Sequence, residues 1–243
     1  MALVGKLNYK TAPQAGRVLV VCGGLSTTEY ADAAIAWLRN GAKRRPSISI
    51  STNYNFESIG IISDYTYLTD PRKFLENIDS VNSNLILPAS LLSGKGEDSI
   101  VQEKIIDTID RIESLGKRVF RLGSFRHPKL KKFNEQIRLS PNGEYKYRNF
   151  GPAGFGALLS ALLMKPAEVL VIGLDGYSGK AVKQMFTGDV VPFKKKDECK
   201  NIKLYLNQVF KLYRQKKVLL STYAGVGLYG MPKRKCGFNV LGK

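Results

Sequence analysis

Short apolar runs alternate with longer amphipathic stretches along the chain. The run RVLVVC (Arg17 to Cys22) is largely β-branched, which is typical of a strand buried in a parallel sheet. Two glycines follow it, and TTEYADAAIAWLRN (Thr27 to Asn40) then has a cap-like threonine and the apolar spacing of a helix. Further strands are predicted at residues 47–52, 64–68, 84–88, 117–123 and 217–222.

Helical patterns separate several of these strands. Residues 98–116 place isoleucines near one helical face, and residues 198–215 form a basic amphipathic pattern. Residues 149–180 predict a glycine-led loop, a helix and a strand that ends at Asp175. Such alternation predicts an α/β, Rossmann-like fold, with a mostly parallel sheet and helices on both faces.

The composition is that of an ordinary globular protein. The chain has 243 residues, of which 44% are hydrophobic and 24% charged, and no repeat or linker divides it. We therefore expect one domain over residues 1–243. No stretch approaches the roughly 20 apolar residues of a membrane span, and no secretory signal is evident, so a cytoplasmic location is expected.

Cysteine and histidine usage argues against several kinds of site. Cys22, Cys199 and Cys236 are widely spaced and odd in number, which indicates neither a disulfide framework nor a zinc site. His127 is the only histidine, so metal sites that use several imidazoles are disfavoured. We expect no metal centre built from such ligands.

The charge is strongly positive and uneven. The net charge is +18, and residues 176–243 hold 13 Lys and 2 Arg against three acidic residues. A solvated, solubilising surface is one explanation. This asymmetry favours a polyanionic partner such as nucleic acid, an anionic glycan or a membrane surface.

Two glycine-containing turns are candidates for binding phosphate. Gly23, Gly24 and Ser26 follow the first strand, and residues 151–154 (Gly151, Pro152, Ala153 and Gly154) precede a helix. Glycines let backbone N–H groups approach a ligand, and helix N-termini attract phosphate. Either turn can also be a tight connection without a ligand. Neither is a dinucleotide fingerprint or a P-loop, which disfavours dehydrogenase and P-loop kinase functions.

Polar residues follow two more strands. Asn53 and Asn55 come after residues 47–52, and Asp70 comes after residues 64–68. These side chains are placed to read a base or ribose edge, although Asn and Asp are also common in turns.

These motifs together carry a resemblance. VVCGGLS, STNYNFE with YLTDP, and GPAGFGALLSALLMKPAEVLVIGLDGY resemble bacterial lipo-oligosaccharide sialyltransferases and the related motility-associated glycosyltransferases and pterin pyrophosphokinase-like proteins. The resemblance covers most of residues 17–177. It implies a site around a cytidine nucleotide formed by Gly23, Gly24, Ser26, Asn53, Asp70, Gly151, Gly154 and Tyr177. Pro152 and Ala153, which lie in the second turn, are further candidates for binding the nucleotide.

The chain departs from the family pattern at three places. Ala153 stands where the family has serine, and Asp70 stands where it favours asparagine, which leaves uridine or another base open. The family's general base is a histidine just before the helix predicted at residues 198–215, and VVPFKKKDECKN has none. Transfer to a hydroxyl needs a proton acceptor, for which Asp175, Asp189, Asp197 and Glu198 are candidates.

Basic side chains are candidates for contacting phosphate or an acceptor. They are His127, Lys194, Lys195, Lys196, Lys233, Arg234 and Lys235. Aromatic residues lie near the last three and suit stacking on bases. The alternative is a solvated lysine loop, a surface histidine, and aromatic side chains in the core.

The resemblance and the charge together predict a glycosyltransferase. It would move a sugar from a CMP- or UDP-type donor to a hydroxyl on a polyanionic acceptor, and hydroxymethylated DNA modified by a viral enzyme is the favoured case, with the base flipped out. One alternative is phosphoryl or pyrophosphoryl transfer to a small metabolite, with Mg²⁺ at Asp70 and Asp175. Another is a non-catalytic nucleic-acid-binding module. No other cofactor is expected.

Overall fold

The computed structural model describes residues 5–7, 12–40, 45–68, 78–88, 99–122, 153–174, 182–183, 190–191, 217–221 and 238–241. The helices in these ranges are α1 (Ser26–Arg39), α4 (Ser99–Ser114) and α6 (Ala153–Leu163), with short 3-10 turns η1 (Glu57–Ile59) and η2 (Ile78–Ser80). The strands are β1 (Gly5–Leu7), β2 (Arg17–Val21), β3 (Ser47–Thr52), β4 (Tyr65–Tyr67), β5 (Asn84–Pro88), β6 (Val119–Leu122), β7 (Glu168–Ile172), β8 (Val182–Lys183), β9 (Val190–Val191), β10 (Lys217–Ser221) and β11 (Phe238–Leu241).

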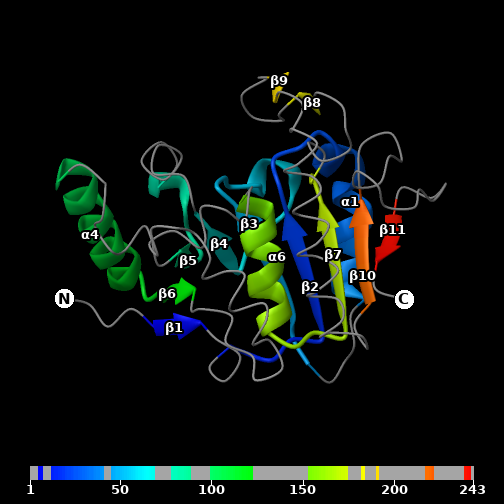
Figure 1. Ribbon diagram of the computed structural model, residues 1–243, viewed down its shortest axis with the longest axis horizontal. Coiled ribbons are helices and arrows are strands. Elements are labelled where there is room, and N and C mark those ends of the chain that lie inside the picture. Colours follow the sequence, from blue (N-terminus) through cyan, green and yellow to red (C-terminus); the bar gives the residue numbers. More distant parts are fainter. Residues whose placement is uncertain are drawn as a thin grey trace, which may run out of the picture.

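One sheet organises the described part of the molecule. Its nine strands run in the order β1-β6-β5-β4-β3-β2-β7-β10-β11 (Figure 1). Every neighbouring pair is parallel except β10 and β11, which are antiparallel. β8 and β9 form a separate two-stranded pair. The predicted α/β, Rossmann-like fold with a mostly parallel sheet is confirmed.

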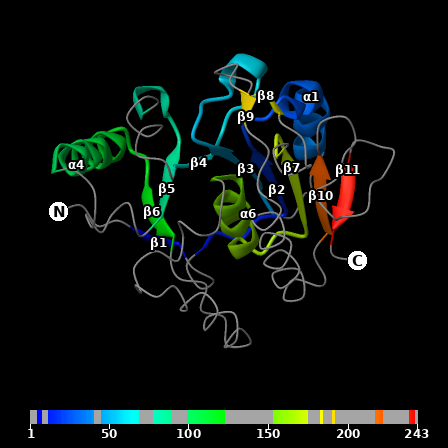
Figure 2. The same ribbon diagram turned by 45° about the horizontal axis from the view of Figure 1, so that its top comes forward.

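The strands are buried on both faces because helices cover them from two sides. Val18 and Val20 belong to the apolar cluster that contains α6, whereas Leu19 and Val21 belong to the cluster that contains α1. Alternate side chains of a strand point to opposite faces, so α1 and α6 lie on opposite sides of β2. Figure 1 shows α6 in front of the sheet and α1 behind it, and Figure 2 shows the two helices on opposite sides of the sheet.

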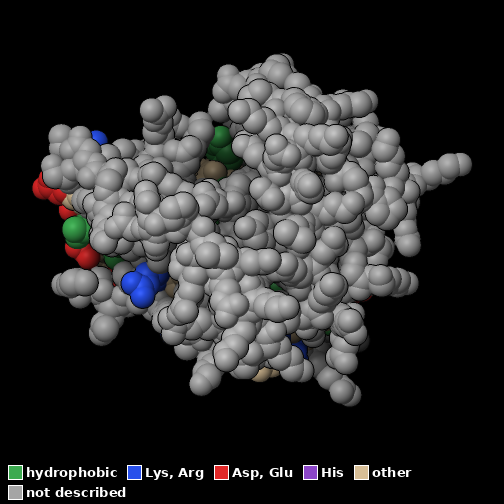
Figure 3. Space-filling view, viewed as in Figure 1, with side chains coloured by type: hydrophobic (Ala, Val, Ile, Leu, Met, Phe, Trp, Pro, Cys, Tyr) green, Lys and Arg blue, Asp and Glu red, His purple; other side chains and the backbone are tan. Residues whose placement is uncertain are grey.

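α4 occupies a different part of the molecule. It lies beside β6, at the end of the sheet opposite β10 and β11 (Figure 2). Its outer surface carries several acidic side chains and the exposed Ile106, which is 58% accessible. Figure 3 shows red acidic and green hydrophobic side chains together at that end of the molecule. The buried Ile109 and Ile112 form its inner side, as the isoleucine spacing predicts.

Element positions agree with the sequence patterns to within a few residues. Strands at 47–52 and 84–88 have the predicted bounds, and the others are shorter by one or more residues. The edge strands β1 and β11 were not predicted, because each is too short to show a periodic pattern and depends on a distant partner. The helix predicted at 198–215 lies outside the described residues. No helix in the described ranges has the length and apolar character needed to cross a bilayer.

The connection from β3 to β4 contains η1 and no α-helix. Tyr54, Phe56 and Ile61 of this connection pack into the apolar cluster beneath α1. The remainder of the connection covers polar positions of β3 and β4, which are described further below.

Candidate functional site

The chain adds strands to the sheet first on one side of β2 and later on the other side, so the switch point lies between β2 and β7. β3 to β6 extend the sheet on one side of β2, while β7 and β10 extend it on the other. In open α/β sheets, ligands bind beyond the carboxyl ends of the strands at such a switch point. The turn after β2 lies at this location, and so does the start of α6, because Gly154 packs against Cys22, which directly follows β2.

Backbone hydrogen bonds hold the ends of β2 and β7 together. The Cys22 N–H donates to the Ile172 carbonyl at 2.9 Å, and the Gly24 N–H donates to the Gly173 carbonyl at 3.0 Å. The Thr27 hydroxyl donates to the Cys22 carbonyl at 2.6 Å, which fixes the first turn of α1 against the strand. The turn after β2 is therefore a rigid element.

Two N–H donors of this turn have no acceptor in the described ranges. The Thr27 and Thr28 N–H groups donate to the carbonyls of Gly24 and Leu25, so they are already used. Within the described ranges, no group accepts a hydrogen bond from the N–H of Gly23 or of Leu25, and both residues are half-buried. Such paired donors beside a helix N-terminus suit an anion.

Ser26 is placed differently from a ligand-binding hydroxyl. Its side chain is fully buried, and its Oγ accepts a hydrogen bond from the Gly173 N–H at 3.0 Å. The hydroxyl therefore joins the start of α1 to the end of β7. Contact between Ser26 and a nucleotide stays a prediction, and it would require a change in the turn because the side chain is fully buried.

Gly173 is a residue that sequence reasoning missed. Its φ is +76°, and a Cβ atom there would overlap the Cys22 carbonyl oxygen and the Thr27 hydroxyl. Only glycine fits such a left-handed position in close contact with backbone. The signal was present, since this glycine directly follows the buried run EVLVI.

The start of α6 is packed tightly over the strand ends. A Cβ atom at Gly154 would lie 2.6 Å from both Cys22 Sγ and Leu174 Cδ1, and one at Gly156 would overlap the buried Tyr67 ring. These glycines let the helix approach the sheet closely. Gly154 therefore has a packing role, whereas the sequence had suggested an open approach for a ligand. Ala153, the first residue of α6, is half-buried.

Asn53 lies at the same edge, directly after β3. Its φ of 60° is the left-handed conformation that asparagine tolerates well, and its N–H donates to the Tyr67 carbonyl at 3.0 Å. Thr52 Oγ1 donates to the Val21 carbonyl at 3.2 Å. The ends of β2, β3 and β4 are thereby tied together, and Asn53 lies at the same edge as the β2 turn.

The remaining candidates fall outside the described residues. They are Asp70, His127, Gly151, Pro152, Asp175, Tyr177, Asp189, Lys194, Lys195, Lys196, Asp197, Glu198, Lys233, Arg234 and Lys235. Their roles stay predictions. Within the described ranges, no group of three or more His, Cys, Asp or Glu side chains is arranged to hold a metal ion.

Two charged features lie away from this edge. Arg17 pairs with Glu168 at 2.9 Å, donates to the Trp37 carbonyl at 2.7 Å and stacks on the Trp37 ring, which fastens the end of α1 to the amino ends of β2 and β7. At the start of β4, burial and the nearby Asp64 raise the pKa of Tyr65, and Arg118 opposes the shift. Both features are structural.

Comparisons with known proteins add no family to this description. No protein-family model matches the sequence, and neither does any curated protein. The likeness to sialyltransferases is thus carried by the motifs quoted above.

Proposed function

We propose that this protein is a glycosyltransferase that moves a sugar from a nucleotide-sugar donor to a hydroxyl on a polyanionic acceptor. The observation that supports it best is the meeting of the β2 turn with the start of α6 at the switch point of a parallel sheet. Gly154 touches Cys22 at the end of β2, so the N-termini of α1 and α6 converge on one edge from opposite faces.

The donor phosphate is the part of the substrate that this edge suits. The first N–H groups of a helix have no partner inside the helix, and the helix dipole adds partial positive charge there. Here two helix N-termini and the N–H groups of Gly23 and Leu25 lie at one edge. A phosphate leaving group would be stabilised by these fixed dipoles as negative charge develops on it.

Asn53 is the proposed contact to the base or ribose. It follows β3, which is next to β2 in the sheet, and it is half-buried at the same edge as Gly23. Its amide offers both donors and an acceptor, so it suits CMP-type and UDP-type donors.

The general base is proposed among three acidic residues. Asp175 comes one residue after Leu174, which ends the described stretch beyond β7, and Asp197 and Glu198 lie in the basic region. A carboxylate within hydrogen-bond reach of the acceptor hydroxyl would take its proton as the sugar is transferred.

The acceptor is proposed from charge alone. A net charge of +18 favours a polyanion, and hydroxymethylated DNA combines such a backbone with a reactive hydroxyl. Phosphoryl or pyrophosphoryl transfer is the second candidate, because the quoted motifs also resemble those of pterin pyrophosphokinase-like proteins. It would need ATP and Mg²⁺ and would not need the basic region.

A two-stage experiment tests the proposal. First, thermal shifts with CMP, UDP, GDP and ATP, with and without Mg²⁺, identify the nucleotide, because a ligand selective for the folded state raises the melting temperature. Second, the matching nucleotide sugars are incubated with hydroxymethylated and unmodified DNA. The proposal predicts a metal-independent shift with CMP or UDP and sugar transfer to the hydroxymethylated DNA alone. A shift with ATP and Mg²⁺ only, or no shift at all, would contradict it.

A further inference from the structure

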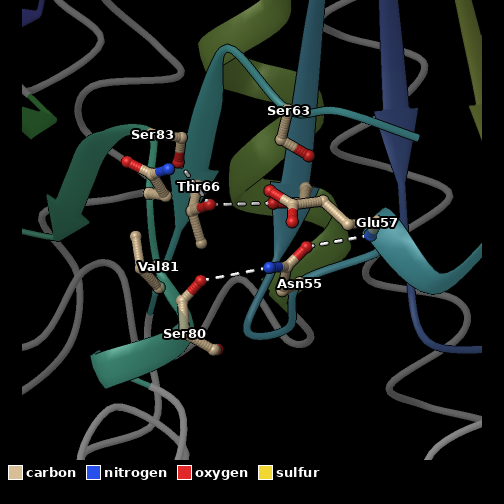
Figure 4. A pocket seen from close by; sticks show the side chains of 9 residues that line it. Asn55, Glu57, Ser63, Thr66, Ser80, Val81 and Ser83 are labelled. Atoms are coloured by element: carbon tan, nitrogen blue, oxygen red, sulfur yellow. Dashed lines mark hydrogen bonds between the residues drawn. The ribbon is translucent and has the colours of Figure 1, made fainter. Parts of the chain in front are cut away.

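A small polar pocket lies beneath the β3–β4 connection, between that connection and the sheet. Its lining residues are Ser51, Asn55, Glu57, Ser63, Thr66, Ser80, Val81, Asn82 and Ser83 (Figure 4). The cavity volume is about 10 Å³, which is room for about one water-sized particle. The pocket is separate from the switch point, because it involves β3, β4 and the segment before β5.

A row of buried hydroxyls forms the floor of this pocket. Ser51 Oγ lies 2.9 Å from Thr66 Oγ1, which lies 2.7 Å from Ser83 Oγ. The outer members also have carbonyl acceptors, with Tyr65 O at 3.4 Å from Ser51 and Asn84 O at 3.3 Å from Ser83. The three hydroxyl protons are thus used within the row, and unused oxygen lone pairs remain.

Ser63 adds an oxygen that the protein leaves without a partner. Its Oγ is buried, and no described residue forms a hydrogen bond with it. Figure 4 shows this hydroxyl directed into the pocket. A buried polar group without a hydrogen-bond partner destabilises the folded state. A bound particle in contact with Ser63 would therefore stabilise the folded protein.

Glu57 brings negative charge to the same place. Asn55 Oδ1 accepts a hydrogen bond from the Glu57 N–H at 2.8 Å, while Asn55 Nδ2 donates to the Ser80 carbonyl at 3.1 Å. These bonds fix the start of η1 beside the pocket, and Figure 4 shows the Glu57 side chain extending into it. In the described part of the chain, no Lys or Arg forms an ion pair with Glu57.

We propose that this pocket binds one monovalent cation, Na⁺ or K⁺, through Glu57, Ser63 and Ser51. The lining offers one carboxylate, the Ser63 oxygen that has no partner, and the oxygens of the hydroxyl row, whose protons are already used. A divalent ion would leave one positive charge without a carboxylate, and Mg²⁺ would also keep several waters that a cavity of about 10 Å³ cannot hold. A single charge balances the single carboxylate. The cation would fasten η1 to β3 and β4, where a helix would otherwise cover the sheet.

The test compares cations at constant ionic strength. The melting temperature of the full chain is measured in Na⁺, K⁺ and tetramethylammonium chloride, the last being too large for the pocket. We expect Na⁺ or K⁺ to raise it by about 2–4 °C relative to tetramethylammonium, as for a ligand that binds the folded state with modest affinity. Binding is measured independently by broadening of the ²³Na resonance and its reversal by K⁺.

Two variants locate the effect. Glu57→Gln should remove the cation dependence, and Ser63→Ala should reduce it. Glu29→Gln is the matched control, since Glu29 is an exposed carboxylate on α1 that lies outside the pocket lining, and it should keep the full dependence. Equal melting temperatures of the wild type in all three salts would overturn the proposal and indicate an ordered water. An equal cation response in the Glu57 and Glu29 variants would also overturn it.

Discussion

The face of the sheet that carries α1 differs between its two halves. On β2 and β7 it presents Leu19, Val21 and Ile172, which pack under α1. On β3 and β4 the positions in register with them are Ser51 and Thr66, and these are equally buried. An amphipathic helix needs an apolar surface beneath it, and the hydroxyl-rich half is covered instead by a connection without an α-helix.

The comparison shows two ways of burying one sheet face. The apolar half gains stability from the removal of hydrocarbon surface from water, without directional requirements. The polar half depends on every hydroxyl finding a partner, because an unpaired buried hydroxyl is costly. The polar pocket lies in the polar half, whereas the apolar half packs beneath α1 and leads to the hydrogen-bonded strand ends of the switch point.

The largest effect is expected for Gly173→Ala, at the rigid end of the apolar half. The new Cβ would overlap the Cys22 carbonyl oxygen and the Thr27 hydroxyl at a left-handed φ of +76°. We expect a loss of about 3–5 kcal/mol in the free energy of unfolding, measured by urea denaturation. Gly116→Ala is the control, because its φ is +71° with no atom within 4 Å, and it should cost only about 1–2 kcal/mol. Equal losses in both variants would show that backbone conformation alone matters.

A smaller effect is expected for Gly156→Ala, where α6 approaches β4. Its Cβ would overlap the Tyr67 ring, so we expect a loss of about 2–3 kcal/mol. Because the two side chains compete for one space, the double variant with Tyr67→Leu should lose less than the sum of the single variants, by about 1–3 kcal/mol. Strict additivity in the double-mutant cycle would rule out this contact.

The polar half is tested by Thr66→Val, which preserves shape and removes the central hydroxyl. Ser51 and Ser83 then lose their shared partner, and we expect a loss of about 1–3 kcal/mol by urea denaturation. Thr28→Val on the exposed side of α1 is the matched control and should change stability by less than about 0.5 kcal/mol. If both substitutions were neutral, the buried hydroxyl row would have no energetic role.

The smallest effect is a pH dependence at Tyr65. Burial and Asp64 raise its pKa, so the folded state holds the phenolic proton more tightly than the unfolded state does. Stability should therefore be unchanged by this group below about pH 10 and should fall as the pH rises above it. Tyr65→Phe should show a shallower decline than the wild type in urea denaturation. If the free energy of unfolding of both proteins fell equally with pH above that value, Tyr65 would not be the group responsible.

The sequence predicted the alternation of strands and helices because apolar runs and helical spacing are local signals. The resemblance to sialyltransferases implied that residues of the β2 turn and of the start of α6 form one site, and the contact of Gly154 with Cys22 brings these two segments together. It did not predict β1 and β11, whose pairing is between distant segments.

The roles of individual glycines were harder to predict. A glycine that admits a ligand and one that admits a neighbouring helix look alike in a sequence, and the sequence did not show that Gly154 packs against Cys22 and Leu174. The buried hydroxyl of Ser26 depends on Gly173, a residue far along the chain. The hydroxyl row of β3 and β4 likewise depends on which segment covers the strands, and no local pattern specifies that.

The central claim is that a nucleotide phosphate binds where the β2 turn meets the start of α6. Isothermal titration with the nucleotide selected by thermal shift, on wild type, Gly23→Asp and Gly23→Asn, tests it most directly, since the two side chains share a shape and differ in charge. We predict that the Asp variant binds at least about tenfold more weakly than the Asn variant, because its carboxylate would repel the phosphate at close range. Equal affinities for the two variants, or no binding of any nucleotide by the wild type, would contradict the claim.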